Sequence, residues 1–251
     1  MSSNTLANLL NPSVPSDDAI IIPDGPTISY SQYKDEVERV AGLLAGAGVM
    51  HGRPVSIILP NSLEFMILFL AVAQAGAVAA PLNSEYTTEE FKFFMEDANS
   101  QLAIIPESTH QGREAANELG IPVIDTSLNN GSVVLRENGQ NLTNSSDPQP
   151  PSEEDVALFL HTSGTTSRPK GVPLTHANLM KSINNIKTHY ELTPEDTSII
   201  VMPLFHVHGL MGASLSTLNS GGSLIIPPRF SASNFWDLQK NNSATWYSAV
   251  P

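Results

Sequence analysis

Apolar and polar residues alternate along this chain in two periods, one typical of helices and one typical of short buried strands. From about Ser31, the helical period places four apolar residues on one face: Tyr33, Val37, Val40 and Leu44. Gly46 and Gly48 then end the predicted helix. Residues 55–59 are apolar except for Ser56, as expected of a strand that is buried on both faces. The pattern therefore predicts a helix followed by a buried strand.

Strand-like and helix-like segments continue to alternate through the rest of the chain. An apolar helix is predicted after Ser62, and Thr87 and Glu90 form a capping box that starts another. The remaining strands are expected at residues 102–105, 156–160, 198–202, 223–226 and 245–249, with helices near 179–186 and 210–218. This order favours an α/β fold of mostly parallel sheets covered by helices.

Two stretches depart from the alternation. Residues 65–80 contain a single polar side chain, Gln74. They fall short of the ~20 apolar residues that a membrane-spanning helix needs, so we expect a buried core helix. Residues 125–154 are rich in Asn, Ser, Pro and acidic residues and are expected to form an exposed connection. This connection would divide the chain into lobes of about residues 1–154 and 155–251.

Composition narrows the classes of protein to consider. The 251 residues carry a formal net charge of -13, which disfavours nucleic acids and anionic membranes as partners. The absence of cysteine excludes disulfides, thiolate metal sites and a cysteine nucleophile. Residues 1–15 contain no secretory signal or Arg-rich transit peptide, so we expect a cytosolic protein, unless a peroxisomal signal lies beyond residue 251.

An acidic protein that binds an anion needs a local site for it, and residues 160–171, LHTSGTTSRPKG, have the composition of such a site. Gly164 permits close approach of the backbone, and Lys170 adds a positive charge suited to phosphate. Five hydroxyl side chains surround that glycine: Thr162, Ser163, Thr165, Thr166 and Ser167. The order of residues differs from the P-loop pattern. On composition alone, a polar surface turn is the alternative.

A second candidate segment, residues 201–210 (VMPLFHVHGL), places His206 and His208 just beyond the predicted strand 198–202. Ligands of open parallel sheets lie beyond the carboxyl ends of the strands, which favours a functional role for both histidines. Zinc binding by this H-x-H pair is an alternative, but no third ligand is identifiable. Two core histidines satisfied by backbone carbonyls are the other alternative.

Residues 163–171 resemble the phosphate-binding signature S-G-T-T-G-x-P-K-G of the adenylate-forming superfamily, which includes acyl-CoA synthetases, luciferases and peptide-synthetase adenylation domains. Ser167 replaces the usual glycine, which is the one departure. Residues 84–94 and 230–251 look most like plant and fungal oxalyl-CoA synthetases. The resemblance extends from about Leu6 to the end of the chain and implies the N-terminal large-domain portion of that fold.

What the resemblance implies is a ligase that uses ATP and Mg²⁺ to activate a small carboxylic acid and then transfers the acyl group to coenzyme A. His206 would be the catalytic gate residue beside the reacting carboxylate, and both His206 and His208 would contact the acid. The β- and γ-phosphates of ATP would be held by the first segment: Thr162, Ser163, Gly164, Thr165, Thr166, Ser167 and Lys170. No metal ligand is assigned.

Oxalate is the favoured acid, with a role in oxalate catabolism, because His208 can donate a hydrogen bond to a second carboxylate. Malonyl-CoA synthetase and 4-coumarate-type CoA ligase activities are the alternatives. The resemblance also implies three elements that residues 1–251 lack: an adenine-proximal segment with a Mg²⁺-binding glutamate, a hinge, and a small C-terminal domain with a catalytic lysine. We therefore expect an incomplete domain with little activity alone, and a non-catalytic nucleotide-binding fragment is the alternative of another class.

Overall fold

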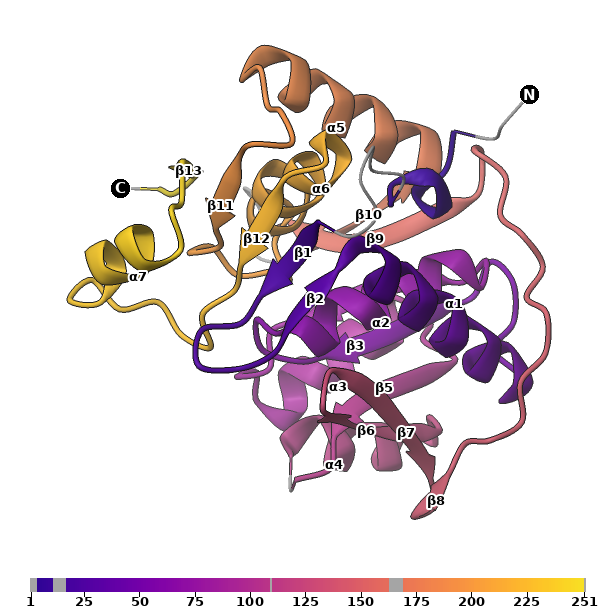
Figure 1. The fold of residues 1–251 in the computed structure, drawn as a ribbon. Helices are drawn as coiled ribbons and strands as arrows, with labels where there is room; N and C mark the ends of the chain where they lie inside the picture. Colours follow the sequence, from indigo (N-terminus) through magenta and orange to yellow (C-terminus); the bar gives the residue numbers. More distant parts are fainter. Residues whose placement is uncertain (1–3, 11–16, 109, 163–168, 251) are drawn as a thin grey trace.

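The computed structural model describes residues 4–10, 17–108, 110–162 and 169–250, which form two β-sheets with helices packed against them (Figure 1). One sheet has the strand order β13-β11-β12-β1-β2, and the other has the order β10-β9-β4-β3-β5-β6-β7-β8. Most neighbouring strands in both sheets run parallel. The predicted α/β fold of mostly parallel sheets covered by helices is confirmed.

The larger sheet has a parallel centre and antiparallel margins. Its parallel strands are β3 (Pro54–Ile58), β4 (Val78–Leu82), β5 (Leu102–Pro106), β6 (Val123–Asn129) and β9 (Val156–Thr162). The antiparallel strands are β7 (Ser132–Glu137), β8 (Gln140–Asn141) and β10 (Lys170–Thr175). Every residue of the central strand β4 is buried, as its neutral apolar composition dictates.

The sheet includes a hairpin where an exposed connection was expected. Strands β6 and β7 pair around Asn130 and Gly131, both of which have positive φ angles, 50° and 85°. An Asn-Gly pair is a strong signal for a two-residue hairpin turn. Val133 and Leu135 on β7 are buried in the core. The expectation for residues 125–154 is therefore wrong for 125–141, whereas residues 142–154 do form a largely exposed connection.

The smaller sheet joins segments from both ends of the chain. Its parallel strands are β1 (Asp18–Ile21), β11 (Thr197–Ile199), β12 (Ser223–Ile225) and β13 (Trp246–Tyr247), and β2 (Thr27–Ser29) pairs antiparallel with β1. Each sheet therefore contains strands from both sides of residue 154, where the boundary between the two lobes was expected. The strand expected at 245–249 is present as β13, but it is shorter and lies at an edge of the sheet with Tyr247 52% exposed, so the expectation of a buried strand was wrong.

The helices fill the space against both sheets. They are α1 (Tyr30–Gly46), α2 (Leu63–Gln74), α3 (Thr88–Asp97), α4 (Gln111–Leu119), α5 (His176–His189), α6 (Ser216–Ser220) and α7 (Phe235–Asn241), with a 3₁₀ turn at Leu6–Asn8 and a π-helix at His208–Leu215. The capping box of Thr87 and Glu90 is confirmed. Residues 65–73 of α2 are all buried, which confirms a core helix. Among the described helices, none has the length and apolarity to cross a bilayer.

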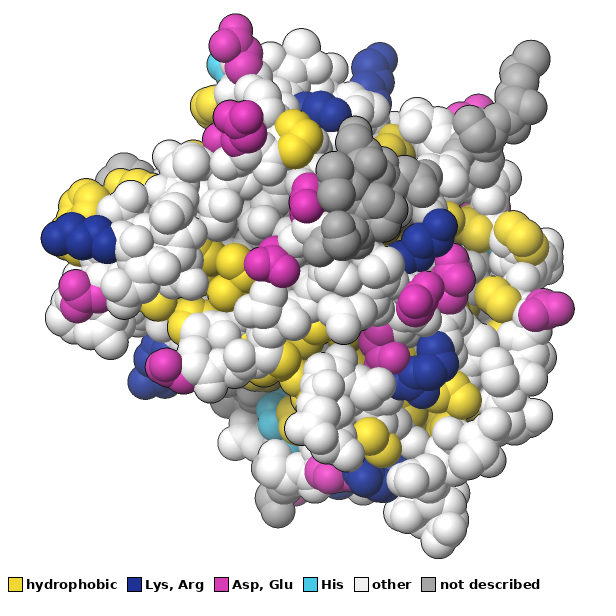
Figure 2. All heavy atoms as spheres, in the orientation of Figure 1, with side chains coloured by type: hydrophobic (Ala, Val, Ile, Leu, Met, Phe, Trp, Pro, Cys, Tyr) yellow, Lys and Arg dark blue, Asp and Glu magenta, His cyan; other side chains and the backbone are white. Residues whose placement is uncertain are grey.

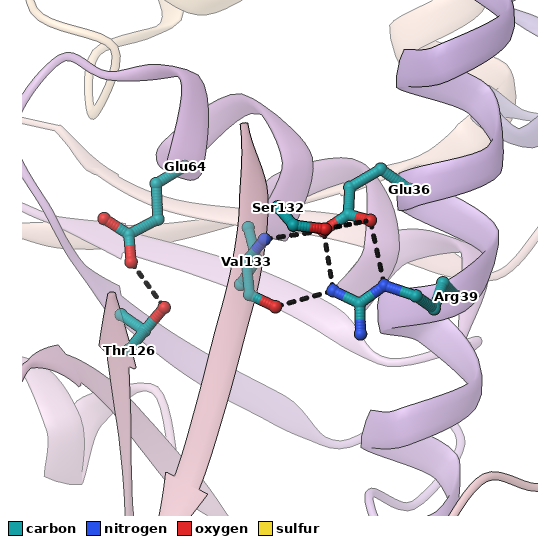
Figure 3. Close-up of polar contacts among 6 residues, drawn as sticks. All are labelled: Glu36, Arg39, Glu64, Thr126, Ser132 and Val133. Atoms are coloured by element: carbon teal, nitrogen blue, oxygen red, sulfur yellow. Dashed lines mark hydrogen bonds and ion pairs between the residues drawn. The ribbon is translucent and has the colours of Figure 1, made fainter. Parts of the chain in front are cut away.

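A polar network fastens α1 to the β6–β7 hairpin (Figure 3). The Glu36 carboxylate accepts hydrogen bonds from the Arg39 guanidinium and from the backbone N–H of Val133, each at 2.6 Å. Arg39 Nη2 also donates to the carbonyl of Val133 at 2.6 Å, and Ser132 Oγ donates to Glu36 at 3.1 Å. Because these charged groups satisfy one another, a half-buried carboxylate is tolerated at this contact.

Candidate functional site

Strands β9 and β10 hold together the two ends of the predicted phosphate segment. Thr162 pairs with Lys170 across the antiparallel ladder, and both residues are exposed. Among the described residues, no ion pair includes Lys170. The other predicted phosphate contacts lie outside the described residues: Ser163, Gly164, Thr165, Thr166 and Ser167. Their role stays a prediction.

The base of this hairpin is fixed by a buried imidazole that the sequence did not indicate. His161 Nε2 lies 2.9 Å from a carboxylate oxygen of Asp97, the last residue of α3, and the His161 side chain is 8% exposed. Gly171 pairs with His161, and a Cβ at Gly171 would lie 2.2 Å from the ring of Phe159. Only glycine fits there without displacing the ring. The α3 helix and the β9–β10 pairing thus fix the position of His161 at the end of β9.

The second candidate segment is a tight turn that follows β11 and enters the π-helix His208–Leu215. The backbone N–H of His206 donates to the carbonyl of Pro203 at 3.2 Å. Gly209 packs against the same turn, since a Cβ there would lie 2.4 Å from the Pro203 carbonyl oxygen and 2.7 Å from that of Met202. π-helical turns occur frequently at functional sites. The close packing fixes the direction of both histidines.

His206 has an environment suited to a neutral imidazole. Its ring lies against Phe205, with centroids 4.3 Å apart. Desolvation by the surrounding atoms lowers the pKa of His206 below its ordinary value, while the residue remains open to solvent. At neutral pH the ring therefore offers one hydrogen-bond donor and one acceptor.

A small cavity joins the two candidate segments. It measures about 20 Å³, and its lining residues come from four parts of the chain: Pro81, Leu82, Tyr86, Phe94, Leu160, His161, Phe205 and His206. This volume accommodates about one water molecule. The end of β9, whose last residue is Thr162, therefore lies next to the turn that carries His206. The fold brings together the two segments that the sequence singled out.

His208 has a separate partner. Its Nε2 atom lies 2.6 Å from the hydroxyl oxygen of Ser248, which directly follows β13. His208 is partly buried and is not among the residues that line the cavity of His206. Ser248 was not predicted as a site residue, although it lies within the strand expected at residues 245–249, at the sheet edge where ligands of parallel sheets are found.

A larger apolar hollow adjoins the start of the turn. It measures about 380 Å³ and is lined mainly by Val201, Met202, Phe230, Trp236 and Tyr247. No carboxylate, amine or imidazole lines it. The hollow therefore lacks charged groups that could contact a phosphate or a carboxylate, unlike the cavity that His161 and His206 line.

Charged and titratable groups elsewhere offer no competing site. Figure 2 shows acidic and basic side chains interspersed over one face, without a basic patch. In the part of the chain that the structure describes, no three His, Asp or Glu side chains gather closely enough to hold a metal ion. Within these described residues, no third ligand joins His206 and His208 in a zinc site.

Comparisons with known proteins identify the family of this chain. The chain is 44% identical over 261 residues to an oxalate-CoA ligase of Arabidopsis thaliana, covering all of this chain and 51% of the relative. It is 33% identical over 265 residues to an oxalate-CoA ligase of Saccharomyces cerevisiae, covering 93% and 49% of the two chains. The ATP-bound crystal structure of MatB from Rhodopseudomonas palustris matches with a TM-score of 0.83 at 30% identity, over 98% of this chain and 49% of that chain.

The chain therefore spans about half the length of the curated relatives it matches. The matched half is the N-terminal domain of the adenylate-forming fold, as the sequence predicted. The family model described as "AMP-binding enzyme" matches residues 12–251, which include both candidate segments and the strands that carry them. This protein is a member of the AMP-binding enzyme family.

Proposed function

We propose that the protein to which these residues belong is an ATP-dependent, AMP-forming ligase that converts a small carboxylic acid, oxalate first, into its coenzyme A thioester. One observation carries the proposal. The end of β9 and the His206 turn, the two segments with the family's signatures, line a single cavity. ATP, Mg²⁺ and coenzyme A are the co-substrates and metal that this activity requires.

The proposed reaction has two steps. A carboxylate oxygen of the acid attacks the α-phosphorus of ATP, the bond to the departing pyrophosphate breaks, and an acyl-adenylate forms. The thiolate of coenzyme A then attacks the acyl carbon, and AMP leaves. Phosphoryl transfer of this kind depends mainly on positioning and charge stabilisation. Lys170 and the hydroxyl groups from Thr162 onward would stabilise the phosphates, and Mg²⁺ would supply further positive charge when bound.

The histidines would recognise the acid. Neutral His206, beside the end of β9, would donate a hydrogen bond to the reacting carboxylate, where its lowered pKa avoids a permanent ion pair with the substrate. His208, whose ring is fixed by Ser248, would contact a second carboxylate. A dicarboxylic acid could offer one carboxylate to each histidine, which an acid with a single carboxylate cannot do. The two oxalate-CoA ligases among the relatives support oxalate over malonate and p-coumarate.

The test is ATP-pyrophosphate exchange by the native-length protein with oxalate, malonate, acetate or p-coumarate. Exchange with oxalate that is lost in His208→Phe supports both the reaction and the acid. Exchange with malonate or p-coumarate alone keeps the reaction and replaces the acid. If no acid supports exchange, the non-catalytic nucleotide-binding alternative takes the place of this proposal.

The cytosolic location is a proposal as well. It rests on the lack of cysteine in the 251 residues, which fits a reducing compartment. Fluorescence microscopy of the native-length protein tagged at its N-terminus would test it. A punctate peroxisomal pattern would contradict it.

A further inference from the structure

Asn61 connects the larger sheet to the turn that carries His206. It lies in the short segment between β3 and α2, just beyond the carboxyl end of a central strand. Its Nδ2 atom donates to the carbonyl of Met202 at 3.0 Å, and its Oδ1 atom accepts from the backbone N–H of Leu204 at 2.8 Å. The side-chain amide thus pairs with this stretch of backbone much as a neighbouring strand would.

The turn is held from the other side by its own packing. The Met202 carbonyl that accepts from Asn61 is also one of the two oxygens against which Gly209 packs. Leu204 is fully buried, and the His206 N–H bonds to the Pro203 carbonyl one step further along. A shift of the Met202 or Leu204 backbone would therefore move the His206 ring, because close packing and hydrogen bonds connect these residues within the turn.

We infer that Asn61 is a positioning residue that acts through His206 and sets where this imidazole meets the reacting carboxylate. The catalytic consequence of this inference rests on the proposed function. Its structural part, that Asn61 positions the His206 ring, does not depend on that function. Nothing else among the described side chains makes two hydrogen bonds to this turn. A displacement of about 1 Å at a reacting group can lower a rate about a hundredfold.

Two substitutions and a matched control separate positioning from general stability. Asn61→Ala removes both hydrogen bonds, and Asn61→Asp keeps the acceptor but removes the donor to Met202. The control is Gln101→Ala, because the Gln101 amide likewise spans backbone groups, those of Met50 and Arg53, at a distant loop. Urea unfolding of each variant measures its loss of stability, and Asn61→Asp provides a folded variant if Asn61→Ala does not fold.

The kinetic experiment is a double-mutant cycle with His206→Ala, measured as acid-dependent ATP-pyrophosphate exchange by the native-length protein. We expect Asn61→Ala or Asn61→Asp to lower kcat about tenfold to a hundredfold, with KM for ATP changing less than about twofold. In the His206→Ala background the same substitution should have almost no further effect. Equal losses in both backgrounds, or an unchanged kcat in the single variant, would overturn the inference.

A second readout does not depend on activity. Imidazole NMR resonances of His206, assigned by their loss in His206→Ala, report the surroundings of the ring directly. Asn61→Ala and Asn61→Asp should both move them, the alanine variant without the field of an added carboxylate, while Gln101→Ala should leave them in place. Unmoved resonances in Asn61→Asp would refute the positioning role even if the protein proves inactive toward every acid. Moved resonances without exchange would instead count against the proposed function alone.

Discussion

The Nε2 atom of His208 lies 2.6 Å from the hydroxyl oxygen of Ser248, a residue forty positions further along the chain. The contact joins the π-helix to the end of the edge strand β13. One rotatable hydroxyl therefore fixes the ring that we propose to contact the second carboxylate of the substrate.

Replacing Ser248 with alanine should weaken binding of the acid without affecting ATP. Loss of one hydrogen bond that orients the imidazole is expected to raise KM for oxalate about threefold to tenfold. Steady-state kinetics of the native-length protein would measure this. Ser223→Ala is the matched control, since it removes one hydroxyl hydrogen bond, to the Asp18 carbonyl, at the start of β12 in the same sheet. Equal KM values for the two variants would count against a role for Ser248.

Gly209 should not tolerate even one added methyl group. An alanine Cβ would come within 2.4 Å of the Pro203 carbonyl oxygen, so the turn must move away. We expect Gly209→Ala to lower the free energy of unfolding by about 1 to 3 kcal/mol and to reduce exchange activity. Gly212→Ala, in the same π-helix, meets its nearest atom at 3.5 Å and should change neither quantity. Similar behaviour of the two variants in urea unfolding and exchange assays would contradict this account.

His176 should make the domain sensitive to mild acid. Its ring accepts a hydrogen bond from the backbone N–H of Leu6 at 3.2 Å and is 1% exposed. Burial lowers the pKa of His176 to about 4, with His51 acting in the same direction and Asp155 opposing them. The folded-state pKa lies below the unfolded one, so the contribution to stability is complete above pH ~6.5 and is lost as pH falls toward ~4.

If the pKa of His176 in the unfolded chain is normal, the fall in pH should lower the free energy of unfolding by about 3 kcal/mol. Urea midpoints between pH 7 and pH 4 would show it as a steep loss in wild type. His176→Asn, which keeps an acceptor for Leu6, should flatten the curve over this interval. His189→Asn, at the exposed end of α5, should leave the wild-type curve unchanged. A wild-type slope retained by His176→Asn would assign the acid sensitivity to other groups.

The hydrogen bonds around Glu36 should affect the stability of the fold at a lower pH than His176 does. Although burial raises it, the pKa of Glu36 is lowered overall by hydrogen bonds from Arg39, the Val133 N–H and Ser132. A lowered folded-state pKa means that this stability is present above the unfolded value near ~4.3 and disappears as pH falls further. At pH 7, Glu36→Gln should cost about 1 to 3 kcal/mol by urea unfolding. Glu38 is exposed on the same helix, so Glu38→Gln should lower the free energy of unfolding only slightly. Equal losses of stability in the two variants would contradict a stabilising role for the hydrogen bonds of Glu36.

Residues 1–251 alone should show little or no thioester formation. The chain spans about half the length of the curated relatives it matches. The resemblance of residues 163–171 implies a Mg²⁺-binding glutamate and a catalytic lysine that residues 1–251 do not supply. Mass spectrometry of reactions with oxalate, ATP and coenzyme A would detect the product. Oxalyl-CoA formed by the isolated 251-residue protein at a rate near that of the native-length protein would refute this expectation.

Local signals predicted much of the fold. The periodicity of Tyr33, Val37 and Val40 matches α1, and the capping box at Thr87 is present as expected, because both depend on neighbours within one helical turn. The hairpin at Asn130 was not predicted, because the polar composition of residues 125–154 is also typical of an exposed connection. The Asn-Gly pair was the signal for a hairpin turn. Strands β1 and β2 were missed because they have only four and three residues and depend on partners far along the chain.

Within the candidate site, only residues of the two candidate segments could be predicted from the sequence. Thr162, Lys170, His206 and His208 stand in recognisable order, so the sequence could single them out. Their supports could not be predicted in the same way. Asp97, Asn61 and Ser248 reach the site from α3, from the end of β3 and from the edge of the smaller sheet, and nothing local marks them. Contacts over such sequence separations are decided by tertiary packing.

Strand β1 also has a consequence for synthesis on the ribosome. Its parallel neighbour β12 lies about 200 residues later, and Ser223 at the start of β12 hydrogen-bonds to Asp18 across 205 positions. At about 5 to 20 residues per second, roughly 10 to 40 seconds pass before that partner is made. Through this interval the β1–β2 hairpin has an open edge on a nascent chain, where a chaperone or another nascent chain can pair with it first.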